Sequence, residues 1–82
     1  MATFGELRRT IFREAGVRDH MQFIALGKEY FEFHREINAV EFKLGYSPEY
    51  IQSVTPEMCD MNLLSDQDFA DWLERFRAIL KR

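Results

Sequence analysis

Hydrophobic residues recur at intervals of three and four positions over most of this chain, which is the spacing of one face of an α-helix. Four residues open the pattern: Phe4, Leu7, Ile11 and Ala15. Thr3 and Glu6 form a capping box at its start, and Gly16 stands where a left-handed residue commonly ends a helix. The pattern therefore predicts a helix over residues 4–15.

The longest regular run comes next and alternates intervals of three and four positions. Its seven members are Phe23, Leu26, Tyr30, Phe33, Ile37, Val40 and Leu44. Asp19 can cap the beginning of a helix here, and Gly45 can end it. We therefore expect one continuous central helix of about 25 residues, over residues 20–44. This helix would hold Gly27 in its interior at a cost of about 1 kcal/mol relative to alanine.

A strand is the alternative interpretation of the second half of this run. Strict alternation, as in a half-buried strand, is shown by Val40, Phe42, Leu44 and Tyr46. Phe31 and Phe33 alternate in the same way. The helical spacing continues through the whole segment without a break, so it favours the helix over a strand in residues 30–46.

Two proline-led helix starts follow the central run. Ser47-Pro48-Glu49 and Thr55-Pro56-Glu57 each place a capping hydroxyl first, then proline at the first helical position and glutamate in the first turn. The intervals after them are too short for long helices. We expect a short helix near residues 48–54 and about one helical turn near residues 56–61.

The C-terminal segment predicts the last helix, over residues 66–81, with Ser65 as its cap. Its amphipathic face consists of Phe69, Trp72, Leu73, Phe76, Ile79 and Leu80. Acidic residues cluster at its start and basic residues at its end, an order that complements the helix macrodipole.

Together these elements predict an all-α fold, a compact bundle of about four helices around one long central helix. The 82 residues are 46% hydrophobic and 15% aromatic, which suits one modest core in a single domain spanning residues 1–82. The expected core comprises Leu7, Ile11, Phe23, Leu26, Tyr30, Phe33, Ile37, Val40, Leu44, Ile51, Phe69, Trp72, Leu73, Phe76 and Leu80.

Candidate metal ligands and nucleophiles are few. His20 and His34 lie 14 positions apart and match no zinc or di-iron spacing, so we expect two surface or rim histidines. Cys59 is the single cysteine and lies between Glu57 and Asp60, whose charges oppose thiolate formation. We expect a half-buried structural cysteine, no metal and no cofactor.

Acid–base catalysis has equally little support. Glu29, Glu32 and Glu36 share one helical face with Lys28 and Arg35, as on a solvated charged surface. The four glycines are isolated and form no phosphate loop. A core filled by aromatic residues leaves little room for a catalytic pocket, so the sequence predicts a protein that is not an enzyme.

The strongest asymmetry in the chain is one of charge. Residues 47–74 hold seven acidic residues and no lysine or arginine, whereas residues 1–46 are net neutral and the last eight are strongly basic. An acidic segment rich in aromatic residues and methionine is suited to a basic protein surface. We therefore expect a protein-binding module that docks on a larger partner and blocks or scaffolds it, or else merely a solvated acidic face. The candidate contact residues are Glu49, Tyr50, Glu57, Asp60, Asp66, Asp68 and Asp71.

A helix-turn-helix DNA-binding regulator is the alternative from a different class. Leu44-Gly45-Tyr46-Ser47-Pro48-Glu49-Tyr50-Ile51 is similar to the turn and second helix of that motif. However, Glu41 stands where the motif usually has a small residue, and the segment from Pro48 to Val54 contains no basic residue. Since phosphate contacts supply most non-specific affinity, this composition argues against direct nucleic-acid binding.

One short motif resembles a known family. Gly45-Tyr46-Ser47-Pro48-Glu49, followed by Val54-Thr55-Pro56-Glu57-Met58, resembles a motif of some phage tail-assembly-chaperone-like proteins, which are small, helical and non-enzymatic. The match covers about 14 of the 82 residues. It departs from the family at Ile51 and Gln52, where an aromatic pair is usual. The resemblance implies a phage origin, with tail assembly as a further alternative function. Small acidic phage proteins also include inhibitors such as anti-CRISPR proteins.

Location and oligomeric state follow from similar considerations. No apolar run approaches the roughly 20 residues of a membrane span, and residues 1–16 lack the apolar core of a signal peptide. With only one cysteine, we expect a cytoplasmic protein in a reducing environment. A monomer is the expected state, and a homodimer through the stripe of the central helix is the alternative.

Overall fold

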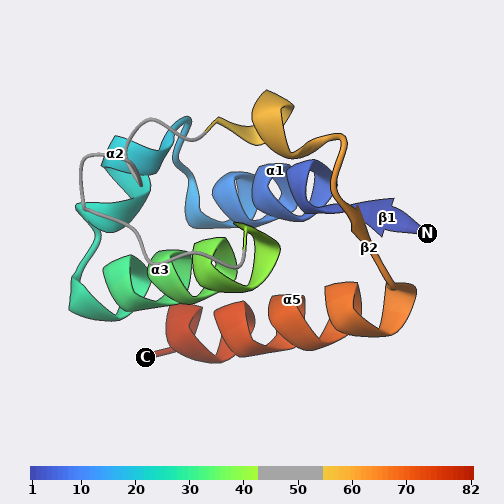
Figure 1. Ribbon diagram of the computed structural model, residues 1–82. Coiled ribbons are helices and arrows are strands. Elements are labelled where there is room, and N and C mark those ends of the chain that lie inside the picture. Colours follow the sequence, from blue (N-terminus) through green and yellow to red (C-terminus); the bar gives the residue numbers. More distant parts are fainter. Residues whose placement is uncertain (43–54) are drawn as a thin grey trace.

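The computed structural model describes residues 1–42 and 55–82 (Figure 1). Its elements, in chain order, are β1 (Ala2–Thr3), α1 (Phe4–Ala15), α2 (His20–Ile24), α3 (Lys28–Phe42), the 3-10 helix η1 (Pro56–Cys59), β2 (Leu63–Leu64) and α5 (Asp66–Leu80). The expected helix at 48–54, the strand alternative beyond Phe42 and the helix-turn-helix segment lie outside the described residues. The mostly helical fold is confirmed, whereas β1 and β2 were not expected.

The two outer helices begin and end where the sequence predicts. The hydroxyl of Thr3 accepts a hydrogen bond from the amide of Glu6, and Gly16 takes a left-handed conformation (φ +74°) at the end of α1. Ser65 caps α5 by accepting from the amide of Asp68. The expected helices over 4–15 and 66–81 are therefore confirmed to within one residue.

The prediction of one continuous helix over 20–44 is wrong. Asp19 does cap its start, but the helix ends after Ile24, and α3 begins only at Lys28. Gly27 between them adopts φ +154°, a conformation that residues with a side chain rarely take. An added Cβ there would meet Tyr30 at an ordinary contact distance of 3.8 Å. Backbone conformation, rather than lack of space, therefore explains glycine at this break.

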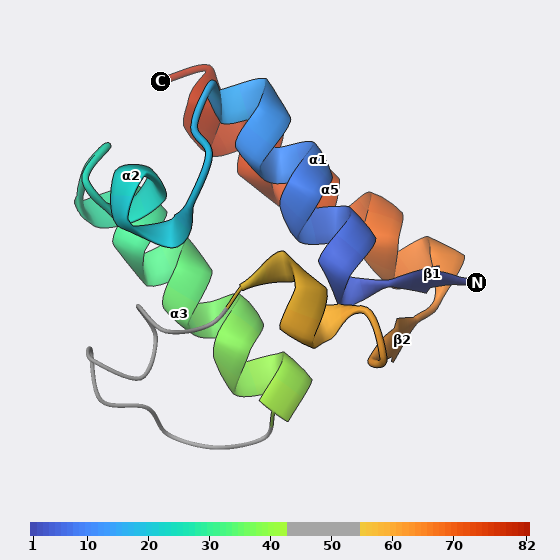
Figure 2. The same ribbon diagram turned by 90° about the horizontal axis from the view of Figure 1, so that it is seen from above.

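The helices pack around α1 (Figures 1 and 2). In Figure 1, η1 and β2 run over one side of α1, and α5 lies on its other side beside α3. β1 and β2 form a two-stranded antiparallel sheet in which Ala2 is opposite Leu64 and Thr3 is opposite Leu63. This pairing fixes the chain between η1 and α5 against the start of α1.

Aromatic rings fill the space between α1, α2, α3 and α5. Phe76 is fully buried, with ring centroids 6.0 Å from Phe23 and 5.9 Å from Phe33. The ring of Phe33 also meets Trp72 edge-on at 5.7 Å. The helical stripes thus identified the centre of the core.

The expected core was wrong at its margins. Leu26, Val40 and Leu80 are 45%, 52% and 39% exposed, because Leu26 lies in the break between α2 and α3 and the other two lie near helix ends. Four members of the expected core are only partly buried against it: Tyr30, Phe69, Trp72 and Leu73. Four hydrophobic residues outside the expected set are buried: Phe4, Phe12, Cys59 and Leu64. Leu44 and Ile51 lie outside the described residues.

Candidate functional site

The structure separates the acidic residues that the sequence grouped together. Glu57 lies on η1 and Asp60 follows it, whereas Asp66, Asp68 and Asp71 belong to α5; all five are exposed. Because η1 and α5 lie on opposite sides of α1 (Figure 1), these carboxylates do not form one continuous patch. Glu49 and Tyr50 lie outside the described residues.

Asp60 and Asp66 are tied to the N-terminal part of the chain. The carboxylate of Asp60 accepts two hydrogen bonds from the guanidinium of Arg9, at 2.8 and 2.6 Å. That guanidinium holds the pKa of Asp60 below its usual value. The carboxylate of Asp66 lies 3.9 Å from the N-terminal amino group of Met1. Part of the acidic charge is therefore already compensated within the chain.

Exposed hydrophobic side chains cluster in sequence along the segment from η1 to β2. Met58, Met61 and Leu63 are 52%, 88% and 65% exposed. Met1, 82% exposed, joins them because β1 pairs with β2 and its amino group approaches the start of α5. We call these four residues the methionine edge. Its carboxylate neighbours are Glu57, Asp60 and Asp66.

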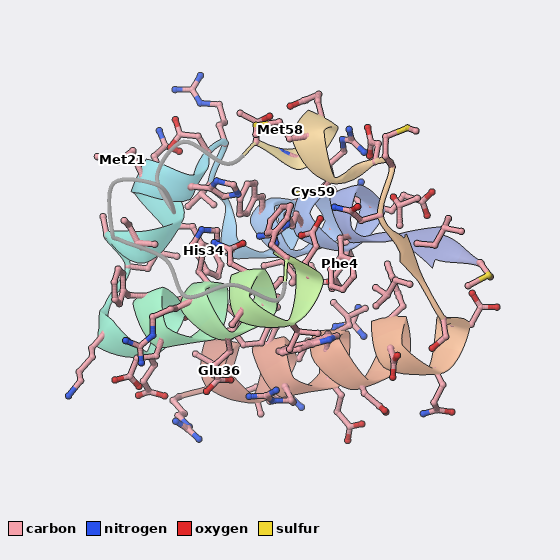
Figure 3. All side chains as sticks on the ribbon, viewed as in Figure 1. Phe4, Met21, His34, Glu36, Met58 and Cys59 are labelled. Carbon is pink, nitrogen blue, oxygen red and sulfur yellow. The ribbon has the colours of Figure 1, made fainter. Side chains whose placement is uncertain are left out.

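The inner side of the same segment is polar and buried, which the sequence analysis missed. Figure 3 shows Cys59 on the side of η1 that faces α1. The side chains of Arg8 and Glu41 are 2% and 0% exposed, and Nη2 of Arg8 donates to Oε1 of Glu41 at 2.5 Å. The other oxygen of Glu41 accepts from Nδ2 of Asn62 at 2.5 Å. This ion pair joins α1, α3 and the η1–β2 segment.

Cys59 belongs to this polar cluster as a neutral thiol. It is fully buried, not half-buried as expected, and its Sγ donates to the carbonyl oxygen of Thr55 at 3.5 Å. Burial raises the pKa of the thiol to about 12, with Arg8 opposing and Glu41 reinforcing the shift. The thiolate, which is the nucleophilic form, is therefore absent at neutral pH.

The two histidines are buried, so the expectation of surface or rim positions is wrong. His20 and His34 are 3% and 2% exposed, and their ring centroids are 4.3 Å apart. Nε2 of His34 lies 3.2 Å from Nδ2 of Asn38. Burial, followed by the proximity of His34 and Arg8, lowers the pKa of His20 to about 3, so His20 is neutral at physiological pH.

Helical spacing contained the signal for these buried polar residues. Arg8 lies four positions from both Phe4 and Phe12, on the buried face of α1. His34 and Asn38 adjoin Phe33 and Ile37 on the buried face of α3. A helical pattern that is traced through hydrophobic residues alone does not identify buried polar residues on the same face of the helix.

Within residues 1–42 and 55–82, no group of three histidine, cysteine, aspartate or glutamate side chains could hold a metal ion. No helix in this described part is long and apolar enough to cross a membrane. The fold defines a small, mostly helical protein, and the candidate site is an exposed hydrophobic edge over a buried ion pair. Comparisons with protein-family models, curated proteins and solved structures find no match to this chain.

Proposed function

We propose that this chain is a non-enzymatic protein-binding module that docks the methionine edge on a larger protein with a basic surface, thereby blocking or scaffolding that partner. A DNA-binding regulator and a phage assembly factor remain the alternatives. The observation that carries the proposal is the exposure of Met58, Met61 and Leu63 on one short segment. Methionine adapts its shape to a partner surface and is common at binding surfaces.

The support beneath this edge favours a preformed surface. η1 packs on α1, β2 pairs with β1, and the amide of Phe4 donates to the carbonyl oxygen of Asn62 at 3.0 Å. Asn62 is also held by the buried carboxylate of Glu41. A surface fixed in this way loses little conformational entropy when it binds.

Charge gives the expected chemistry of the partner. Three exposed carboxylates adjoin the methionine edge, those of Glu57, Asp60 and Asp66, and residues 55–66 contain no lysine or arginine. Such a rim steers a basic protein surface towards the apolar centre and repels nucleic acid. The expected partner therefore has an apolar patch with lysine or arginine around it.

The apolar part of the proposal is tested with the double variant Met61→Ser/Leu63→Ser. Its matched control is Leu26→Ser/Val40→Ser, which removes two exposed hydrophobic side chains elsewhere. The immobilised wild-type chain is used to isolate a partner from an extract of the source cells, and the affinity of the purified partner is then measured. We expect the edge variant to bind at least about tenfold more weakly, a loss of about 1.4 kcal/mol, and the control to bind like wild type. Equal losses in both variants would contradict the proposal.

The charged part is tested with Glu57→Lys, matched by Glu32→Lys on α3. Both glutamates are exposed, and neither forms an ion pair in the described part of the chain. We expect Glu57→Lys to slow association with the partner, most clearly at low salt, because rim charges act mainly through steering. If Glu57→Lys instead strengthens binding to duplex DNA and leaves partner binding unchanged, the DNA-binding alternative is favoured.

A further inference from the structure

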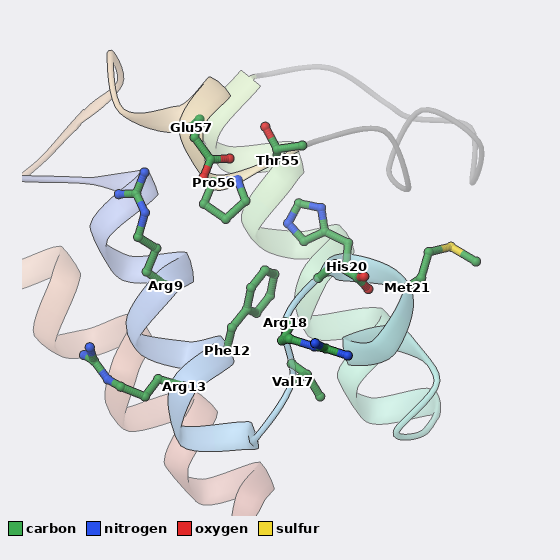
Figure 4. A pocket seen from close by; sticks show the side chains of 11 residues that line it. Arg9, Phe12, Arg13, Val17, Arg18, His20, Met21, Thr55, Pro56 and Glu57 are labelled. Atoms are coloured by element: carbon green, nitrogen blue, oxygen red, sulfur yellow. The ribbon is translucent and has the colours of Figure 1, made fainter.

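A second candidate site is a groove of about 560 Å3 between α1, the beginning of α2 and η1 (Figure 4). It borders the methionine edge at Glu57, which also lines the groove. Pockets for small molecules are commonly about 300–1,000 Å3, so the groove has the size of a small-molecule site. Figure 4 shows Arg9 and Arg13 on the α1 side, Arg18 and Met21 on the opposite side, and Phe12 between them.

The groove carries two exposed arginines, Arg13 and Arg18, that form no ion pair within the described part of the chain. Arg9 is engaged by Asp60. The lining also holds two carboxylates. That of Asp19 caps α2, where it accepts from the amide of Gln22 at 2.9 Å, and that of Glu57 is exposed on η1 and acts electrostatically on Arg9.

His20 gives a second and independent indication of a ligand. Its ring is 3% exposed, lines the groove and meets Phe12 edge-on at 5.0 Å. Its Nε2 atom is buried and has no hydrogen-bond partner among the described residues. In Figure 4 the ring lies between Phe12 and the Thr55–Pro56 wall. A buried polar atom without a partner destabilises the fold, and a bound molecule would supply the missing hydrogen bond.

We propose that this groove binds a small phosphorylated molecule. Its phosphate lies against Arg18, its uncharged part lies over Phe12 and Pro56, and a polar group of the ligand completes the hydrogen bonding of His20. Arg13, on the other side of Phe12, adds positive charge at the rim of the groove (Figure 4). The planar guanidinium is suited to phosphate, which it can bind through two parallel hydrogen bonds. A long peptide fits less well, because the groove presents no strand edge: β1 and β2 lie at the other end of α1 (Figure 1).

The test is a titration of the full chain with pyrophosphate and with a nucleoside diphosphate, followed by NMR and calorimetry. The site variant is Arg13→Gln/Arg18→Gln. The matched control, Lys28→Gln/Arg35→Gln, removes the same charge from exposed positions on α3 that do not line the groove. We expect saturable binding that the site variant weakens at least about tenfold, an effect of the size expected for charge-assisted hydrogen bonds, while the control stays within about twofold of wild type.

His20 provides a readout that general attraction of anions would not move. We expect saturation to displace the Cε1–H resonance of His20, and His20→Gln to bind the nucleoside diphosphate more weakly while it keeps the wild-type fold. Absence of saturable binding, or equal losses in the site and control variants, would overturn the proposal. Tighter binding of a single-stranded oligonucleotide than of either diphosphate would overturn it in favour of a nucleic-acid site. The variants of this test change Arg13, Arg18 and His20, none of which belongs to the methionine edge, so the failure of this proposal and that of the proposed function are distinguishable.

Discussion

The two sides of the α1–α3 pair are held together by different chemistry. On the α5 side, the rings of Phe33, Trp72 and Phe76 fill the interface. On the η1 side, α1 and α3 are joined by the buried ion pair of Arg8 and Glu41. Hydrophobic packing tolerates many partners of similar volume, whereas a buried charge requires its specific counter-charge. We therefore expect the two sides to differ less in the stability that each contributes than in the substitutions that each tolerates.

Loss of the counter-charge on the polar side gives one of the two largest expected effects. We expect Glu41→Leu to lower the free energy of unfolding by about 3–5 kcal/mol, because Arg8 then remains buried and unpaired. The double variant Arg8→Met/Glu41→Leu removes both charges and should recover most of this loss. Chemical denaturation of the two variants measures the difference. A double variant as unstable as Glu41→Leu would show that the ion pair is not what holds this side.

A large-to-small substitution on the aromatic side should lower the free energy of unfolding by a similar amount, and no second substitution is expected to restore it. We expect Phe33→Ala to cost about 3–5 kcal/mol, because it leaves a cavity against Trp72 and Phe76. The conservative variant Phe33→Leu should cost clearly less, since it keeps much of the volume. The same denaturation experiment measures both. A near-neutral Phe33→Ala would mean that the ring cluster contributes little to the core.

The difference between the two sides also explains what the sequence could predict. Hydrophobic periodicity located the aromatic side, because Phe33, Phe76 and their neighbours repeat at helical intervals. The same periodicity did not identify the polar side. Arg8, Glu41 and His34 have buried side chains, although residues of these types are usually found on the surface. Their burial depends on partners that folding brings from distant segments, such as Asn62 for Glu41.

Two further features depended on backbone conformation. The hydrophobic pattern continues on both sides of Gly27 as it would in one helix. The positive φ of Gly27 in the structure marks the break between α2 and α3. The paired strands comprise two residues each, too few for alternation to be visible in the sequence. The acidic segment was visible as composition, but its division between η1 and α5 depends on the tertiary fold.

Close packing of η1 on α1 gives the next largest effect. A Cβ added to Gly5 would lie 2.7 Å from the carbonyl oxygen of Pro56 and 1.9 Å from Oδ1 of Asp60. Asp60 can move, but the backbone of η1 cannot do so without a shift of the segment. We expect Gly5→Ala to cost about 1–3 kcal/mol, as in other overpacked sites, measured by thermal and chemical denaturation. Gly16→Ala serves to separate backbone strain from steric clash, because its φ of +74° strains a residue with a side chain while nothing lies within 4 Å of it.

The buried His20 predicts a dependence of stability on pH. The pKa of His20 is about 3 in the fold against about 6.5 in the unfolded chain. Between these two pH values, His20 is therefore protonated in the unfolded chain and neutral in the folded protein. Stability is complete above about pH 6.5 and is lost as the pH falls towards 3, by up to about 1.4 kcal/mol per pH unit. Denaturation midpoints between those limits measure this slope.

His20→Gln separates this contribution from that of the carboxylates. It removes the titrating group and should reduce the slope in the upper part of the window, where Asp60 and Glu14 remain ionised because their pKa values are lowered by Arg9 and Arg77. An unchanged slope in His20→Gln would assign the pH dependence to other groups.

The smallest effect is expected at the exposed Arg9–Asp60 pair, which also joins α1 to the η1 segment. Its geometry is favourable, with two hydrogen bonds between guanidinium and carboxylate. However, both side chains are 42% exposed, so water and salt screen the attraction. We expect Asp60→Asn to shift the melting temperature less than Gly5→Ala does, and the shift to shrink further at high salt. The Arg8–Glu41 pair connects the same helix to the same side of the molecule, yet its variants should show little salt dependence because both groups are buried. A large, salt-insensitive loss in Asp60→Asn would show instead that η1 is held on α1 chiefly by its outer ion pair.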